Sequence, residues 1–196
     1  MLVIGISGQT GAGKSTLSKK ICEKIKAEYI DVDTLGHRLL KDAKTIEHLI
    51  KAFGKDILTN SEIDRKKLGS KAFASAEATE KLNSIMHPRM VDFVKEIIND
   101  SRELNREYVV VDAALLYKMK LNALCNVIIY VKADPEIRFS RLVATRGWTE
   151  QRARERLFSQ DQEPNGDNNI IVIENNGTKQ DFEKSINQTI SKIIEF

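Results

Sequence analysis

The chain has 196 residues, of which 41% are hydrophobic and 30% are charged, and its formal net charge is +3. These values are typical of a soluble globular protein, and the mildly basic charge suits polyanionic ligands without requiring nucleic acid. No apolar run has the length that a membrane-spanning helix needs, so we expect no transmembrane segment.

The first predicted element is a buried parallel strand at residues 2–7, LVIGIS, an apolar run that is rich in β-branched residues. Because this strand opens the chain, we expect no signal peptide and a cytoplasmic protein. Cys22 and Cys125 have no metal-binding or redox spacing, and we expect both to be buried as small hydrophobic residues.

A phosphate-binding loop is predicted next, since residues 8–15 fit the pattern G-x-x-x-x-G-K-[ST] between a strand and a helix. The glycines let backbone N–H groups turn inward around an anion, and the following helix points its positive end at the same place. Lys14 is expected to reach the β- and γ-phosphates, and Ser15 to bind Mg²⁺. The expected ATP contacts of this loop are Gly11, Ala12, Gly13, Lys14, Ser15 and Thr16.

Further apolar runs alternate with helical patterns along the rest of the chain, which predicts an α/β protein. We expect a P-loop nucleoside-triphosphate-hydrolase-like fold, with a parallel five-stranded sheet and helices on both faces. The later strands are expected at residues 29–32, 108–111, 127–131 and 170–173.

Three functional regions are predicted from this organisation. Residues 1–34 and 105–196 form a nucleotide-binding core, residues 35–104 a helical acceptor-binding insertion, and residues 138–160 an arginine-rich lid within the core. The insertion shows no convincing strand, and each proline falls at a predicted helix start or in a loop. Its expected helices are residues 35–41, 46–53, 65–73, 76–86 and 89–99.

Carboxylates follow two of the predicted strands. Alternation along the second strand would send Asp31 and Asp33 to the same side, where one of them could take a proton from an acceptor hydroxyl. The alternative is that Asp33 only caps the next helix, and the residues alone do not separate the two interpretations. Asp112 ends the third strand and is predicted to support Mg²⁺ together with Ser15, although many strands end in an aspartate.

Two further groups carry chemistry or structure. In Met86-His87-Pro88-Arg89, the residues alone favour a helix cap at His87 with Pro88 as the first helical residue, and the functional alternative has His87 or Arg89 facing an anionic acceptor. Guanidinium groups match phosphate oxygens, and Arg141 and Arg146 are the lid candidates. The remaining arginines of this segment are expected on the surface: Arg138, Arg152, Arg154 and Arg156.

Taken together, these motifs resemble the dephospho-CoA kinase family along nearly the whole chain. GISGQTGAGKST, IDVDTLGH, EIDRKKLGSKAF, HPRM, VVVDAALLYK and IIVIENNGT resemble successive family motifs, and Ala114 and Lys118 depart from them. The resemblance implies that the ATP γ-phosphoryl group is transferred to the ribose 3′-hydroxyl of 3′-dephospho-CoA, with Mg²⁺. It assigns Asp33 as the base, Arg141 as a lid arginine and Asn175 as a residue near the adenine. The implied acceptor contacts are Asp33, His87, Arg89 and Arg65.

Two alternatives remain open at this point. A nucleoside or nucleotide kinase shares the architecture, although the predicted insertion places Phe53, Phe73 and Phe93 at core-like positions rather than in a base-stacking pocket. A GTPase is the other alternative, because residues 178–181, TKQD, fit a guanine-recognition pattern at a predicted helix start. We expect a monomer or weak homo-oligomer whose partner is the small-molecule acceptor, with no nucleic acid and no membrane.

Overall fold

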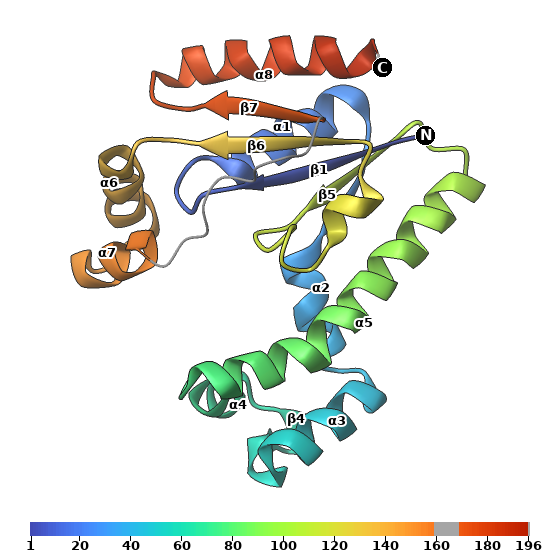
Figure 1. The fold of residues 1–196 in the computed structure, drawn as a ribbon, viewed down its shortest axis with the longest axis vertical. Coiled ribbons are helices and arrows are strands. Elements are labelled where there is room, and N and C mark those ends of the chain that lie inside the picture. Colours follow the sequence, from blue (N-terminus) through green and yellow to red (C-terminus); the bar gives the residue numbers. More distant parts are fainter. Residues whose placement is uncertain (159–168, 196) are drawn as a thin grey trace. The chain divides into compact units, whose positions relative to one another are not determined.

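A computed structural model describes residues 1–158 and 169–195 of the chain. The chain divides into two compact units, Met1–Ile30 with Ile98–Phe196 and Asp31–Ile97. The first unit holds the main sheet and the second holds a group of helices (Figure 1).

The main sheet has five strands in the order β2-β5-β1-β6-β7, and all five predicted strands are confirmed. The pairs β1–β5, β1–β6 and β6–β7 are parallel. The register sets Ile6 of β1 beside Asp112 of β5, so Asp112 lies next to the start of the phosphate loop. The strands are β1 (Leu2–Gly8), β2 (Glu28–Asp31), β5 (Tyr108–Asp112), β6 (Val127–Lys132) and β7 (Ile170–Glu174).

Helices of the first unit pack on this sheet and follow its strands. The buried core joins inward side chains of β1 and β6, such as Ile4 and Ile129, to α1 and α8 through Leu17 and Ile186. In Figure 1, α6 begins beyond the arrowhead of β6, at the end of the sheet where ligands bind in open α/β folds. The elements are α1 (Lys14–Ile25), η2 (Leu121–Leu124), α6 (Pro135–Arg146), α7 (Glu150–Phe158) and α8 (Lys179–Ile194).

The second unit is helical, as predicted, but it also contains a short antiparallel hairpin that the sequence analysis missed. Its turn residues Asn60 and Ser61 both have positive φ, 51° and 66°, as the two-residue turn of a hairpin requires. Strands of two residues are too short to show alternation. The elements are α2 (Val32–Leu39), α3 (Ala43–Phe53), η1 (Lys55–Ile57), β3 (Leu58–Thr59), β4 (Glu62–Ile63), α4 (Arg65–Ala72) and α5 (Ala76–Glu103).

The prediction that a helix begins at Pro88 is wrong, because Pro88 lies inside the continuous helix α5. An interior proline removes one backbone hydrogen bond and costs roughly 3 kcal/mol. Here Pro88 is exposed, while Met86, Met90 and Val94 are buried at four-residue intervals on the same helix. Burial of this apolar stripe offsets the lost hydrogen bond, so the helix continues through the proline.

Two expectations about burial also need correction. Phe73 is 69% exposed at the end of α4, whereas Phe53 is buried as expected. Cys22 and Cys125 are free thiols that are only partly buried. Burial still raises the pKa of Cys22 to about 11 and that of Cys125 to about 12, so both stay protonated and unreactive near neutral pH.

Candidate active site

The phosphate loop connects β1 to α1. Two of its glycines have a backbone conformation that other residues rarely adopt and leave no room for a Cβ atom. Gly13 has φ +109°, and a Cβ atom there would lie 2.6 Å from Asn175 Nδ2. Gly11 has φ +82°, and a Cβ atom there would lie 3.0 Å from the carbonyl oxygen of Arg138. Gly13 precedes α1 and has no side chain to cap it, so no capping side chain competes with an anion at the start of this helix.

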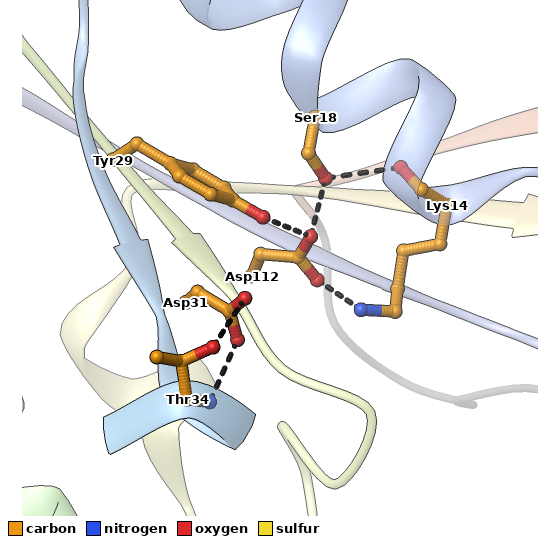
Figure 2. A network of polar contacts seen from close by, with 6 residues as sticks. All are labelled: Lys14, Ser18, Tyr29, Asp31, Thr34 and Asp112. Carbon is orange, nitrogen blue, oxygen red and sulfur yellow. Dashed lines mark hydrogen bonds and ion pairs between the residues drawn. The ribbon is translucent and has the colours of Figure 1, made fainter. Parts of the chain in front are cut away.

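The Asp112 carboxylate lies at the centre of a polar network beside this loop, and Figure 2 shows its contacts. Asp112 is only 4% exposed. Lys14 Nζ forms an ion pair with its Oδ1 atom, while Ser18 Oγ and Tyr29 OH lie 2.7 and 2.9 Å from its Oδ2 atom. The structure therefore brings the predicted phosphate-binding lysine and the predicted metal-binding aspartate together.

The donor set at this place suits Mg²⁺ in its chemistry. Asp112 offers a carboxylate and Ser15 offers an exposed hydroxyl in the first turn of α1, and both are the hard oxygen ligands that this ion prefers. Among the described residues, no group of three or more His, Cys, Asp or Glu side chains could hold a metal.

A second network joins α6, the loop after β7 and the phosphate loop. Asn175 is 6% exposed, and its Nδ2 atom donates to the carbonyl oxygen of Ala12 at 2.7 Å. Arg141 Nη2 donates to the carbonyl oxygen of Asn175 at 3.0 Å and lies 3.3 Å from its Oδ1 atom. The Arg141 Nη1 atom is buried and has no hydrogen-bond partner within residues 1–158 and 169–195.

Arg138 is a residue whose role the sequence analysis missed, because the expectation that it lies on the surface is wrong. It is 5% exposed, its Nε atom donates to the carbonyl oxygen of Ala133 at 3.0 Å, and burial lowers the pKa of its guanidinium. It lines a cleft of about 250 Å³ together with Gln9 of the phosphate loop and Asn176. Arg138 and Arg141 are three residues apart, which places both on one face of α6. This spacing could have indicated from the sequence that Arg138 lies on the same face as Arg141.

In the helical unit, the expectation that Asp31 and Asp33 alternate along a strand is wrong. The strand β2 ends at Asp31 and α2 begins at Val32, so Asp33 is an exposed residue in the first turn of a helix. Asp31, not Asp33, caps this helix and accepts from the Thr34 N–H group at 2.9 Å (Figure 2). The sequence analysis considered Asp33 as a helix cap, but the residue that caps α2 is Asp31.

The other predicted acceptor contacts have partners within this unit. Arg89 forms an ion pair with Asp42 and donates to Thr45 Oγ1 at 2.7 Å. Hydrogen bonds from the backbone and hydroxyl of Thr45, followed by Arg89, hold the pKa of Asp42 below its ordinary value. Arg65 Nη2 lies 2.8 Å from His37 Nε2. Arginine has only donors, so the His37 Nε2 atom is the acceptor in this contact.

His87 does not cap a helix, because it lies within α5 in a partly buried position. The helix cap that the residues alone favoured at this place is therefore wrong. The lid candidate Arg146 ends α6, and part of the predicted lid lies outside the described residues.

The guanine-recognition pattern at residues 178–181 has a local structural explanation. Asp181 N donates to Thr178 Oγ1 at 3.2 Å, and Thr178 N donates to Asp181 Oδ2 at 2.9 Å, which is a capping box at the start of α8. Hydrogen bonds from the hydroxyl and backbone of Thr178 hold the pKa of Asp181 below its ordinary value. The pattern is accounted for by helix capping, so it gives no support to a GTPase.

The loop after the central strand, the carboxylate on the neighbouring strand and the arginine next to the loop define the class of the protein. It is a P-loop phosphotransferase. Comparison with known proteins narrows this class. The sequence model of the dephospho-CoA kinase family matches residues 2–181, and the chain belongs to that family.

Individual relatives agree with this assignment. A dephospho-CoA kinase of Fusobacterium nucleatum is 31% identical over 191 residues, which cover 95% of each chain. A crystal structure from Thermus thermophilus has a TM-score of 0.76 at 23% identity and covers 97% of each chain. A dephospho-CoA kinase structure from Campylobacter jejuni has a TM-score of 0.68 at 22% identity, covering 97% of this chain and 96% of the other. The two structures support the fold. None of the described helices is long and apolar enough to cross a membrane.

Proposed function

We propose that this chain transfers the γ-phosphoryl group of ATP to the ribose 3′-hydroxyl of 3′-dephospho-CoA and releases CoA and ADP, the final step of coenzyme A synthesis. The observation that carries the proposal is the pairing of Lys14 with Asp112 beside an uncapped phosphate loop, in a chain of the dephospho-CoA kinase family. The cytoplasm is the proposed compartment, and a monomer or weak homo-oligomer the proposed state.

On the donor side, residues 11–16 hold the phosphates through backbone N–H groups, and Lys14 contributes a positive charge. Ser15 and Asp112 are the residues that would hold Mg²⁺. When bound, this ion offsets negative charge on the phosphate oxygens. Lys14 pairs with Asp112 in this structure, and we propose that nucleotide entry replaces the carboxylate with phosphate as the main partner of Lys14.

Arg141 and Asn175 act next to the phosphates in this proposal. Asn175 fixes the Ala12 carbonyl and, with it, the shape of the loop. Arg141 is already oriented by Asn175 and keeps a buried Nη1 donor for the transferring group. Asn175 is also the proposed contact near the adenine, and the cleft beside Arg138 and Gln9 lies in the same part of the first unit.

On the acceptor side, we propose Asp33 as the base that takes the proton of the attacking hydroxyl. Asp33 is exposed in the first turn of α2, so its carboxylate is accessible for this role. His87, Arg89 and Arg65 are the proposed contacts with the anionic acceptor. Their residue types suit phosphate recognition, since arginine binds phosphate oxygens through two parallel hydrogen bonds. Residues 35–104 are the proposed acceptor region and 138–160 the proposed lid.

Arg141→Ala is expected to lower kcat by about 10³-fold while the KM for the acceptor changes less than threefold. The reason is that an arginine facing the transferring group stabilises charge that develops only in the transition state. Steady-state kinetics with both substrates varied would measure the two constants. Arg152→Ala is the matched control, because Arg152 is an exposed arginine of α7 stacked on Trp148 at 4.4 Å. A large rise in acceptor KM at constant kcat would instead make Arg141 an acceptor contact.

The proposed function is tested by measuring ADP release from Mg·ATP with 3′-dephospho-CoA, beside adenosine, AMP, CMP, UMP and no acceptor. We expect fast release only with 3′-dephospho-CoA, and a product heavier by one phosphate in mass spectrometry. Preference for a nucleoside monophosphate would keep the donor site and overturn the acceptor assignment. Equal release without any acceptor would indicate a nucleoside triphosphatase.

A further inference from the structure

Asp112 receives its contacts unevenly on its two carboxylate oxygens. The positive charge of Lys14 is on Oδ1, while the neutral hydroxyl groups of Ser18 and Tyr29 are both on Oδ2 (Figure 2). A buried carboxylate is costly unless hydrogen bonds or a counter-charge stabilise it. The Oδ1 atom is thus stabilised by Lys14, which is also proposed to bind the nucleotide phosphates. The Oδ2 atom is stabilised by two hydroxyl groups for which no phosphate contact is proposed.

The two hydroxyl groups are not equivalent. Ser18 Oγ lies 2.7 Å from Asp112 Oδ2 and 3.0 Å from the carbonyl oxygen of Lys14, and both of these are acceptors. A serine hydroxyl has a single proton, so it donates to one of them at a time. Tyr29 OH lies 2.9 Å from the same Oδ2 atom and is the second donor to it. The Oδ2 atom of Asp112 therefore depends on Tyr29 whenever Ser18 donates to the backbone.

The partial exposure of Tyr29 also indicates that its hydroxyl group, rather than its ring, is the part that matters at this position. The residue is 39% exposed on β2, so burial of its ring is incomplete, yet its polar end reaches a carboxylate that is only 4% exposed. An aromatic side chain selected for core packing would bury its ring instead. This arrangement is explained by the contact that the hydroxyl makes.

We infer that Tyr29 is a positioning residue that holds Asp112 in place while Lys14 is engaged with nucleotide phosphates. The inference rests on the proposed donor role of Lys14. In this structure, Lys14 and the hydroxyl groups share the carboxylate. Once Lys14 has moved, Tyr29 keeps Oδ2 hydrogen-bonded and leaves Oδ1 directed toward the phosphate loop. The hydroxyl of Tyr29 is thus needed most in the nucleotide-bound state.

The test is Tyr29→Phe, which removes one oxygen atom and keeps the ring. We expect the affinity for ATP, measured by calorimetry with and without Mg²⁺, to fall about tenfold in the presence of the ion, as for loss of a hydrogen bond to a charged group. Tyr108→Phe is the matched control, because it removes a tyrosine hydroxyl at the opposite end of β5. This control should bind ATP like the parent protein.

A thermodynamic cycle with Lys14→Met gives a second readout that needs no nucleotide. Without Lys14, Asp112 depends on the hydroxyl groups in the free protein as well. Tyr29→Phe should therefore lower the melting temperature by on the order of 4 °C in the Lys14→Met background and by less than half as much in the parent. Equal losses in both backgrounds, with unchanged ATP affinity, would show a purely structural tyrosine and overturn the inference.

The outcomes separate this inference from the proposed function. Binding and melting measurements involve no acceptor, so they remain valid if the acceptor proves to be another molecule. An active wild-type kinase whose Tyr29→Phe variant binds Mg·ATP as tightly as the parent would overturn the role of Tyr29 alone. A wild-type protein that does not phosphorylate 3′-dephospho-CoA would overturn the proposed function and leave the tenfold binding prediction standing.

Discussion

Lys14→Ala is expected to reduce kcat/KM for phosphoryl transfer by on the order of 10³-fold, as loss of a donor to a developing negative charge does in other enzymes. Lys14 supplies the charged side chain of the phosphate loop, at the first residue of α1. Phosphoryl transfer depends on positioning and charge stabilisation, so removal of this charge affects the transition state directly. Steady-state ADP release with 3′-dephospho-CoA as the acceptor measures the loss.

The structure shows why this variant needs a careful control. Removal of Lys14 also leaves the buried Asp112 without its cation, which lowers the folding stability in addition to the activity. Lys14→Ala combined with Asp112→Asn removes the uncompensated charge and should restore most of the melting temperature without restoring turnover. Full activity of Lys14→Ala would contradict the assignment of the phosphate loop.

Asp33→Asn is expected to lower kcat by about 10²–10⁴-fold, the range for loss of a general base, while the dissociation constant of Mg·ATP changes less than twofold. The amide keeps the size of the side chain but cannot accept the hydroxyl proton. Asp33 lies in the second compact unit, whereas Lys14, Asp112 and Arg141 lie in the first. Calorimetry with Mg·ATP and single-turnover kinetics with 3′-dephospho-CoA measure the two effects separately.

The matched control is Asp92→Asn, an exposed aspartate of the same unit whose recorded ion pair is with Lys95 at 3.6 Å. This control should leave both constants close to those of the parent. If ATP affinity collapses in Asp33→Asn, then Asp33 belongs to the donor and metal site, and the base must be sought elsewhere. If kcat is unchanged in Asp33→Asn, then Asp33 is not the base that takes the proton.

The strands β1, β5 and β6 of the main sheet were predictable because each is a short apolar run that is buried in the sheet, whereas β2 and β7 are less buried. The phosphate loop was predictable because its glycines, lysine and serine have fixed spacing. The short helix α2 was misjudged at its start, since Asp31 and Thr34 form a cap whose residues also suit the end of a strand. The sequence analysis divided α5 into two helices at Pro88, because proline disfavours a helix interior. The buried stripe that supports the continuous helix depends on packing, which local propensity does not include.

The contacts within the site were less accessible to sequence reasoning. Lys14 and Asp112 were each predicted, but in separate roles, and their ion pair follows from the adjacency of β1 and β5 in the sheet. Arg138 and Arg141 look alike in the sequence, and only the packing of α6 against the phosphate loop distinguishes the buried residue. Tyr29 carries no motif at all, because its hydroxyl acts on a residue that is distant in the chain.

The bond from Asn175 to the Ala12 carbonyl spans 163 residues, and this separation bears on synthesis of the protein. A growing polypeptide carries the complete phosphate motif long before the segment that supports the loop has left the ribosome. Because β7 and the loop after it emerge well after the phosphate motif, a nascent chain that lacks them cannot assemble the finished loop. We therefore expect nucleotide binding to depend on β7 having joined the sheet, so a fragment that ends before Ile170 should bind ATP far more weakly than the whole chain.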